Sequence, residues 1–429
     1  MKGQTEQAHF LNELQKKSFH YFLDLYNPDN GLIPDTNEKE SPASITGVGF
    51  ALSSYPIAVE KKLFSRAEAA KRTLVTLRFL FNSEQSEKPE ATGYKGFYYH
   101  FLDMKTGRRT WKSELSFIDT GFLLAGVICA AEYFHKNNPA ENEIQKLATA
   151  IIDRVDWCWA LDNRKALSHG WHPESGFIHY DWEGYSEAIL LYCLALGADK
   201  LAISNESFEA WSSTYQWENI YDVDFLYAGP FFIHLFSHAW IDFREIRDKF
   251  MCEKKIDYFE NTRRAIQVQK SYCLRNPKSF IGYQKNCWGI TADEGPSNNK
   301  QILSGDEIVF FGYSARGVPY GPDDGTIAPW ASVASLPFDP DSALDAIKHL
   351  RETYPQLQGQ YGFKCSFNLS VTPVWCPERF FAMDVGIIIM MIENAQSGLI
   401  WNLMKKSSII QRGLKRAGFN GGWLKGMGR

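Results

Sequence analysis

Six stretches of the chain carry apolar residues on every side of a predicted helix. A helix that is apolar all round is buried on all sides, whereas a helix with one apolar stripe lies at the surface. The six stretches are residues 43–59, 114–134, 185–197, 225–240, 328–336 and 378–396. We therefore expect six inner helices, and most of them begin beside a loop that carries carboxylates and Trp or Tyr.

Striped helices alternate with these buried stretches. Their apolar residues recur at helical spacing in four sets: Phe10, Leu14, Phe22 and Leu25; Ala70, Leu74 and Leu77; Ile144, Leu147, Ile151 and Val155; Ala343, Ile347 and Leu350. Helices joined by short loops are usually antiparallel neighbours, so all inner helices would begin at one rim. The pattern predicts an all-α fold, an (α/α)6 barrel with a double ring of alternating inner and outer helices and long rim loops.

We expect one catalytic domain over residues 1–429, because no stretch is typical of a linker. The segment richest in Gly and Pro, residues 289–330, also carries Tyr313, Tyr320 and Trp330, which disordered linkers avoid. It is better interpreted as ordered loops over a site. Hydrophobic residues make up 45% of the chain, enough for a large core, and a net charge of -4 provides no basic field for nucleic acid.

Cysteine usage and hydropathy limit the possible environments. The eight cysteines form no CxxC pair, so buried thiols are expected rather than a zinc site. No apolar run reaches the length of a membrane span, and residues 1–10 lack the apolar core of a signal peptide. We expect a soluble monomer, periplasmic or secreted if a signal peptide has been removed and otherwise cytoplasmic.

Several well-known catalytic motifs are missing from the sequence. It contains no GxSxG, no HExxH, no Walker A motif and no Rossmann fingerprint between a strand and a helix. His234 and His238 are spaced to face one metal, but core histidines are the simpler interpretation in so aromatic a segment. We expect neither a metal nor a cofactor.

Aromatic residues and carboxylates share several Gly-rich segments. The faces of sugar rings pack on Trp and Tyr, and sugar hydroxyl groups bond to carboxylates. Core filling is the alternative explanation for any one of the 13 Trp and 20 Tyr residues. The mixed segments are Trp171-His172, Tyr180 to Tyr185, Trp288 with Asp293-Glu294, Asp323-Asp324 with Trp330, and Trp375 with Glu378.

The segment from Trp182 to Ala188 is predicted to open an inner helix. Glu183 and Glu187 are four residues apart and would share one face of it. Glu183 could merely complement the helix dipole. Glu187 stands one turn deeper, beside an apolar run, where its neutral form is favoured, as a general acid near neutral pH requires.

Two further carboxylates are embedded in predicted inner helices. If Pro377 occupies the first helical position, Asp384 lies nearly two turns inside, followed by eight uncharged residues. A carboxylate so deep is either paired, here with Arg379, or functional. Asp119, in another predicted inner helix, is likewise either paired or functional. A pair of carboxylates is the minimum for glycoside hydrolysis.

These motifs together resemble glycoside hydrolase family 144, which is typified by bacterial endo-β-1,2-glucanases and sophorose-releasing enzymes. The matching segments are Ser113-Glu114 to Asp119-Thr120, Trp182 to Ala188, Asn286 to Pro296, Asp323 to Thr326 with Ala328 to Ala331, and Glu378-Arg379 through Asp384. The resemblance implies an (α/α)6 barrel and a metal-free inverting hydrolysis of a β-glucan, most of all β-1,2-glucan.

The resemblance also implies roles for individual residues. Glu187 would be the general acid and Asp384 the general base, with Asp119 as the other candidate base. Residues expected to bind substrate are Glu114, Asp119, Trp182, Glu183, Tyr185, Trp288, Asp293, Glu294, Trp330 and Trp375.

Other functions stay open at the level of sequence. A glucoamylase-like hydrolase could act on another glucan, because a fold does not fix its substrate. A polysaccharide lyase can use a similar helical toroid, although an acidic rim would repel a polyanion. A non-catalytic glycan-binding protein would have the aromatic residues but no need for embedded carboxylates.

Overall fold

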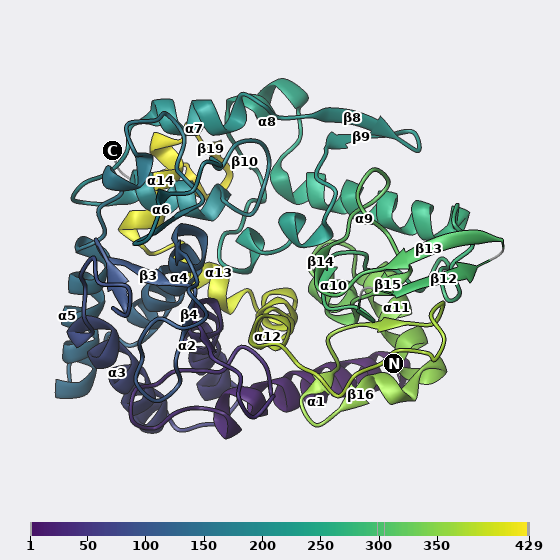
Figure 1. Cartoon of the computed structure of the whole chain (residues 1–429). Coiled ribbons are helices and arrows are strands. Elements are labelled where there is room, and N and C mark those ends of the chain that lie inside the picture. The colour runs from purple at the N-terminus through teal and green to yellow at the C-terminus, as the bar shows by residue number, and fades with distance from the viewer. Residues whose placement is uncertain (1, 298, 304, 427–429) are drawn as a thin grey trace.

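The computed structural model describes residues 2–297, 299–303 and 305–426 of the chain, and helices dominate it (Figure 1). The α-helices are α1 (Lys2–Asp24), α2 (Ile45–Glu60), α3 (Arg66–Asn82), α4 (Phe117–Tyr133), α5 (Pro139–Asp153), α6 (Ile189–Gly197), α7 (Asn205–Ser212), α8 (Lys249–Lys254), α9 (Tyr258–Arg275), α10 (Pro329–Ala334), α11 (Pro340–Thr353), α12 (Ala382–Gln396), α13 (Leu399–Met404) and α14 (Ser408–Arg416). Short 3-10 helices are η1 (Trp159–Leu161), η2 (Phe231–His234), η3 (Ser237–Ala239), η4 (Pro355–Leu357) and η5 (Gly422–Leu424). The prediction of a mainly helical protein is confirmed.

Strands are short and lie in the loops between helices. They are β1 (Ala43–Ser44), β2 (Gly93–Tyr94), β3 (Phe97–Tyr99), β4 (Phe101–Leu102), β5 (Leu115–Ser116), β6 (Gly170–His172), β7 (Gly176–Phe177), β8 (Trp217–Ile220), β9 (Val223–Leu226), β10 (Ile246–Arg247), β11 (Ala292–Asp293), β12 (Asn299–Leu303), β13 (Asp306–Phe310), β14 (Ser314–Ala315), β15 (Thr326–Ile327), β16 (Gln358–Gly359), β17 (Gly362–Phe363), β18 (Phe367–Asn368) and β19 (Asn420–Gly421). The largest sheet has the order β2-β3-β5-β6-β7, and Leu115 pairs with Trp171 in it. Strand β5 leads directly into α4, so this sheet holds the start of an inner helix.

Five of the six fully apolar stretches form α-helices, namely α2, α4, α6, α10 and α12. Their side chains are buried almost throughout, as the absence of an apolar stripe predicts. Helices α2 and α4 pack backbone to backbone, because a Cβ atom on Gly126 would lie 2.2 Å from the Gly49 carbonyl oxygen. Helix α12 lies beside α2 near the middle of the molecule (Figure 1).

The sixth stretch, residues 225–240, is not an α-helix, and its prediction was wrong. It consists of the end of β9, then η2 and η3. Gly229 and Pro230 interrupt it, and Gly317 packs so closely that a Cβ there would lie 2.3 Å from the Gly229 carbonyl carbon. Apolar runs alone do not distinguish a helix from other buried segments. The burial of residues 225–240 was therefore predicted correctly, whereas their helical conformation was not.

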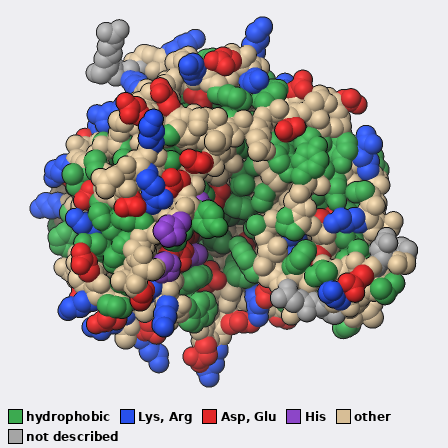
Figure 2. All heavy atoms as spheres, turned by 45° about the horizontal axis from the view of Figure 1, so that its top comes forward, with side chains coloured by type: hydrophobic (Ala, Val, Ile, Leu, Met, Phe, Trp, Pro, Cys, Tyr) green, Lys and Arg blue, Asp and Glu red, His purple; other side chains and the backbone are tan. Residues whose placement is uncertain are grey.

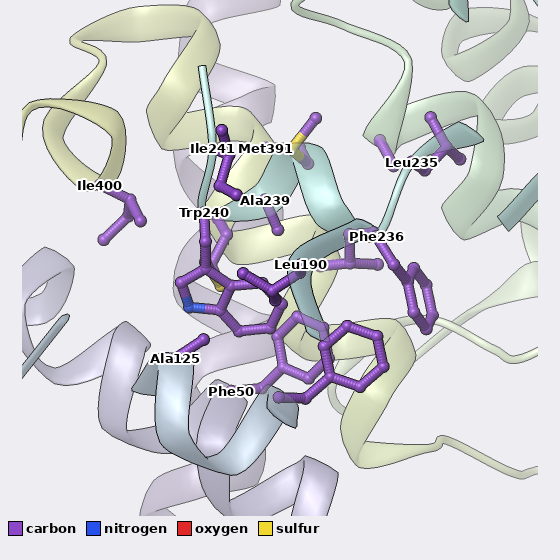
Figure 3. Close-up of a cluster of buried hydrophobic side chains, with 14 of the residues drawn as sticks. Phe50, Ala125, Leu190, Leu235, Phe236, Ala239, Trp240, Ile241, Met391 and Ile400 are labelled. Carbon is purple, nitrogen blue, oxygen red and sulfur yellow. The ribbon is translucent and has the colours of Figure 1, made fainter. Parts of the chain in front are cut away.

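Trp240, at the end of this segment, lies in the centre of the core (Figure 3). Its ring stacks on Phe122, with 5.6 Å between ring centroids, and lies 4.9 Å from Phe50. Its indole Nε1 donates a hydrogen bond to Ser53 Oγ at 2.9 Å. A single cluster of buried hydrophobic residues extends from Leu11 to Leu424. The irregular segment therefore fills the space between α2, α4 and α12.

The striped helices α1, α3, α5 and α11 bury one face each. In α5 the buried residues include Ile144, Ala148 and Ile151, and in α11 they include Ala343, Ile347 and Leu350. Helix α9, which the apolar pattern did not single out, buries Ala265 and Ile266 in the same way. None of the described helices combines the length and the apolar character needed to cross a membrane.

Candidate active site

A cavity of about 440 Å³ lies where α4 and α12 begin and α6 is about to begin, within the size range of small-molecule sites. It is lined by Asp35, His100, Phe101, Ile118, Asp119, Phe122, Glu187, Phe232, Phe236, Ala292, Asp293, Tyr313, Trp330, Phe381, Met383 and Asp384. Figure 2 shows a hollow in one face of the molecule, with hydrophobic side chains inside it and histidines beside it. The cavity thus brings five carboxyl groups into an apolar surrounding.

Asp119 is the third residue of α4 and is held by the cap of that helix. Ser116 is the N-cap, and its Oγ accepts a hydrogen bond from the Asp119 backbone N at 3.2 Å and donates one to Oδ2. Thr46 Oγ1 donates to Oδ1 at 2.6 Å from the first turn of α2. Such reciprocal capping orients an acidic side chain at a helix start. Both oxygens of Asp119 therefore already accept hydrogen bonds.

His100 joins Asp119 to Glu114. Its Nδ1 lies 2.8 Å from Glu114 Oε1 and 3.6 Å from Asp119 Oδ2. Burial lowers the pKa of His100, but the charges of Asp119, Glu114 and Asp35 outweigh it and raise the pKa to about 9. The imidazolium in turn outweighs the effect of burial on Glu114 and lowers its pKa. The sequence analysis did not identify His100, because a lone histidine between aromatic residues has no characteristic spacing.

The ligand atoms of these three residues lie within 4.8 Å of one another, close enough for a metal ion. Nδ1 of His100 is also at hydrogen-bond distance from Glu114 Oε1. An ion pair between the imidazolium and the two carboxylates is therefore a second arrangement that fits this cluster.

Glu187 lies in the turn just before α6 and is 9% exposed. Burial raises its pKa to about 7, and the charge of Asp119 adds to the shift. The prediction that Glu183 and Glu187 share a helix face was wrong, because α6 begins only at Ile189. Gly184 has a φ of +76°, which turns the chain and leaves Glu183 exposed. Ser237 Oγ holds the turn by donating to the Glu187 carbonyl oxygen at 2.8 Å.

Asp384 is the third residue of α12, the position that Asp119 has in α4. The helix begins at Ala382 rather than at Pro377, so the prediction that Asp384 lies two turns inside was wrong. The Ala382 backbone N donates to the Asp35 carbonyl oxygen at 2.8 Å, which fixes the helix start against the loop after α1. Local sequence could not reveal this anchor, since it is provided by a distant segment.

The carboxyl group of Asp384 is 6% exposed, and its Oδ2 has no hydrogen-bond partner among the described residues. Arg379, the expected partner, instead forms ion pairs with Glu294 and Glu38. Burial raises the pKa of Asp384 well above its usual range, and the charges of Asp293 and Asp35 add to the shift. Asp384 lines the cavity, although this unpaired oxygen is itself buried.

Asp293, at the end of β11, also lines the cavity. Its Oδ2 accepts a hydrogen bond from Trp330 Nε1 at 2.9 Å, and its Oδ1 accepts one from the Glu294 backbone N at 2.7 Å. Burial raises its pKa to about 7. Arg316 supports this segment from below by donating to the Asp293 carbonyl oxygen at 2.7 Å and by pairing with Asp324.

Asp323 and Asp324, although part of an expected rim motif, are structural. Asp324 and Arg316 are both fully buried and bonded to each other. Asp323 accepts hydrogen bonds from Tyr272 at 2.8 Å and Tyr283 at 2.6 Å. These carboxylates fix the loop that carries Asp293.

Asp35 and Tyr313 also line the cavity, and the sequence analysis identified neither. Burial raises the pKa of Asp35 to about 6, with His100 lowering it and Asp119 raising it. Tyr313 is 62% exposed and lies at the border of two cavities, since it lines both of them. Both residues come from irregular loops, where neither hydropathy nor periodicity marks a site.

Of the aromatic residues expected in the site, only Trp330 is among the described residues that line the cavity. Tyr185 and Trp288 are buried in the core, where Tyr185 stacks on Tyr258 and Trp288 packs against Phe231. Trp182 stacks on His169, with 4.1 Å between ring centroids, and Trp375 pairs with Asn368 through the backbone. The apolar lining comes mainly from phenylalanines: Phe101, Phe122, Phe232, Phe236 and Phe381.

A second cavity of about 590 Å³ adjoins the first and shares Asp35, Tyr313 and Phe381 with it. Its other lining residues are Thr36, Glu38, Lys39, Glu40, Ser41, Trp111, Glu294 and Arg379. We call this second cavity the outer groove and the first one the inner cavity. Glu294, expected to bind substrate, lies in the outer groove.

Comparison with known proteins places the chain in a family. Residues 179–408, more than half of its length, match the family Glycoamylase, described as "Putative glucoamylase". The chain belongs to the Glycoamylase family. The matched region contains Glu187, Asp293 and Asp384, so the family resemblance covers three of the five carboxyl groups of the inner cavity.

Individual relatives of this Glycoamylase family member are similar over nearly its whole length. An "exo beta-1,2-glucooligosaccharide sophorohydrolase (non-reducing end)" of Parabacteroides distasonis is 26% identical over 95% of this chain, which spans only 57% of that protein. A crystal structure of a "putative glucoamylase" from Bacteroides uniformis is 29% identical and covers 97% of this chain and 98% of its own, with a TM-score of 0.86. An endo-β-1,2-glucanase of Chitinophaga pinensis, in complex with sophorotriose and glucose, is 24% identical over 97% of this chain and 99% of its own, with a TM-score of 0.84.

In this Glycoamylase family member, carboxyl groups in and beside the inner cavity differ in the protonation state that their surroundings favour. A carboxyl group with a pKa near 7, such as Glu187, still holds a proton near neutral pH and can donate it. Glu114, next to the cavity, faces the His100 imidazolium, which lowers the pKa of Glu114 and favours its ionised form. Such a division of carboxyl groups is what acid and base catalysis requires.

Proposed function

We propose that the protein hydrolyses β-1,2-glucan by an inverting mechanism, with Glu187 as the general acid and Asp384 as the general base. The observation that carries the proposal is the pairing, in one buried cavity, of a carboxyl group that keeps its proton near pH 7 with a carboxyl group that has a free oxygen. An inverting glycosidase needs a protonated acid and an ionised base on opposite sides of the scissile bond, so the role of base requires Asp384 to be ionised when the substrate is bound.

The linkage of the substrate rests on the relatives. The Parabacteroides distasonis protein is named as acting on β-1,2-glucooligosaccharides, and the Chitinophaga pinensis protein as an endo-β-1,2-glucanase. The composition of the inner cavity supports a neutral sugar, because phenylalanine and tryptophan faces alternate with carboxyl groups and His100 is the only cationic side chain among its described lining residues.

The proposed reaction is a single displacement. The Glu187 carboxyl group gives its proton to the glycosidic oxygen as the bond from that oxygen to C1 breaks. A water molecule attacks C1 from the opposite face, and its proton passes to Asp384, directly or through a substrate hydroxyl group. Asp119 is less suited to be the base, because both of its oxygens already accept hydrogen bonds from Thr46 and Ser116.

We further propose that the helices form a complete (α/α)6 barrel and that residues 1–429 are one catalytic domain. The alternation of buried and striped helices supports the ring, with residues 225–240 in the place of one inner helix. The cluster of buried residues from Leu11 to Leu424 supports a single domain. The net charge of -4 supports a protein without a nucleic-acid partner, and we propose that it is monomeric.

A panel of polysaccharides tests the function. The protein is incubated with linear β-1,2-glucan, other β-glucans, α-glucans and uronate polymers, and products are detected as reducing ends and by the absorbance of unsaturated sugars. We expect reducing ends from β-1,2-glucan alone, and NMR at early times should show inverted anomers. Unsaturated products would identify a lyase, reducing ends from another glucan only would change the substrate, and retained anomers would exclude the single displacement.

A further inference from the structure

The outer groove contains an exposed tryptophan on a firmly held loop. Trp111 is 67% exposed, and both it and Lys112 have left-handed backbones, with φ of +55° and +51°. Non-glycine residues in this conformation cost free energy and persist where the surroundings impose them. Exposure alone does not indicate a binding site, but Trp111 also lines the outer groove beside charged residues.

Arg109 holds this loop in place. Its Nε donates to the Ser113 carbonyl oxygen at 2.6 Å, and its Nη2 donates to the Lys112 carbonyl oxygen at 2.9 Å. The guanidinium is itself fixed by an ion pair with Glu174 at 2.7 Å, and the Arg109 side chain is only 3% exposed. The position of Trp111 is therefore built into the fold.

Three aromatic rings connect the outer groove to the inner cavity. The Trp111 ring centroid lies 5.2 Å from that of Phe101, and Phe101 stacks on His100 at 4.0 Å. Phe101 and His100 line the inner cavity, whereas Trp111 lines the outer groove. A molecule in the inner cavity that continues outward would meet Trp111 next.

The other residues that line the outer groove are mostly polar and carry charges of both signs. Arg379 forms ion pairs with Glu38 and Glu294, and all three residues line the groove. Lys39 and Glu40 also line the groove. A groove that combines an aromatic ring with such hydrogen-bonding groups suits a neutral sugar ring, which has an apolar face and a rim of hydroxyl groups.

We infer that the outer groove binds the glucan chain beyond the sugar unit held in the inner cavity, with one ring stacked on Trp111 and its hydroxyl groups bonded to Glu294 and Arg379. This inference rests on the proposed function, since it takes the same glucan as ligand. The outer groove would make the protein selective for longer chains. Residues that bind the distal sugars would raise the affinity for long oligomers and would not change the affinity for the shortest ones.

Binding to a series of chain lengths tests this inference. Glu187→Gln protein is titrated by calorimetry with β-1,2-glucan oligomers of two to eight glucose units, and the series is repeated with Trp111→Ala, Trp111→Phe and Tyr180→Ala added. We expect affinity to rise with length, and Trp111→Ala to weaken the long oligomers by about 3- to 10-fold while leaving the shortest unchanged. Trp111→Phe should retain most of the gain, since it keeps an aromatic face.

Tyr180→Ala is the matched control, because Tyr180 is 73% exposed and lines neither the inner cavity nor the outer groove. Equal losses for short and long oligomers in Trp111→Ala, or no loss at all, would overturn the inference. If the wild-type protein nevertheless hydrolyses β-1,2-glucan, the proposed function stands and only the role of the outer groove is excluded. If no oligomer binds at any length, the inference and the proposed function fail together.

Discussion

Trp330 donates its indole Nε1–H to Oδ2 of Asp293 at 2.9 Å, inside the apolar inner cavity. Trp330 belongs to the first turn of α10 and Asp293 ends β11, 37 positions apart in the chain. A hydrogen bond to a buried charged group contributes more than one between neutral groups. The indole therefore fixes the direction of one carboxyl group and offsets part of the rise that burial causes in its pKa.

Trp330→Phe should lower activity while keeping the fold. The substitution retains an aromatic ring but removes the donor, at a cost of about 1–3 kcal/mol to the ionised carboxylate, so we expect a loss of about 5- to 100-fold in kcat/KM. Trp288→Phe is the control, because Trp288 is equally buried and its Nε1 has no partner among the described residues. Equal activity losses in the two variants would show that packing, not the hydrogen bond, is responsible.

Glu187→Gln should remove most hydrolysis and alter the pH dependence of activity. A positioned acid contributes about 10²- to 10⁴-fold. In the wild type we expect kcat/KM to fall as the pH rises through about 7, because Glu187 then loses the proton that it donates. This alkaline limb should be missing from the residual activity of the variant. An unchanged alkaline limb would assign it to another group.

The same variant should be more stable than the wild type at alkaline pH. Burial raises the pKa of Glu187 from 4.5 to about 7, so the stability linked to its proton is fully present below pH 4.5 and is lost as the pH rises through 7. Glutamine has no proton to lose. Urea unfolding should show similar stability at pH 5 and an advantage for Glu187→Gln on the order of 3 kcal/mol at pH 8 or above.

Asp384→Asn and Asp119→Asn distinguish the two candidate bases. Asp384→Asn should reduce kcat by about 10²- to 10⁴-fold without lowering the melting temperature, because Oδ2 has no partner to lose and asparagine avoids the cost of ionising a buried carboxyl group. Asp119→Asn should lower the melting temperature, because the carboxylate accepts hydrogen bonds from Thr46 and Ser116 and caps α4. Full activity in Asp384→Asn would transfer the role of base to Asp119.

His100→Gln should destabilise the protein at neutral pH but not at high pH. The nearby carboxylates raise the pKa of His100 to about 9, so its stabilising charge is fully present below pH 6.5 and is lost as the pH rises through 9. Unfolding of the variant and the wild type by urea at pH 6 and pH 10 measures the difference. A stability difference that does not change with pH would mean that His100 acts through packing alone.

Some features could be predicted from residues 43–59, 114–134 and 378–396 alone. Burial depends on how many apolar residues a segment carries on each side, and this is a local property of the sequence. The same holds for carboxylates placed beside apolar runs, and Asp119, Glu187, Asp293 and Asp384 do line one cavity. The role of each in a reaction remains a prediction.

The tertiary structure decided where each helix begins and which side chains meet. Helix α12 begins at Ala382 because the Asp35 carbonyl oxygen caps it, and residues 225–240 are irregular because Gly229 and Gly317 pack against each other. Asp35, His100 and Tyr313 enter the inner cavity from loops without any periodic pattern, while Trp288 and Tyr185 turn into the core. These outcomes depend on contacts between segments far apart in the chain, and the order of residues within one segment contains no information about them.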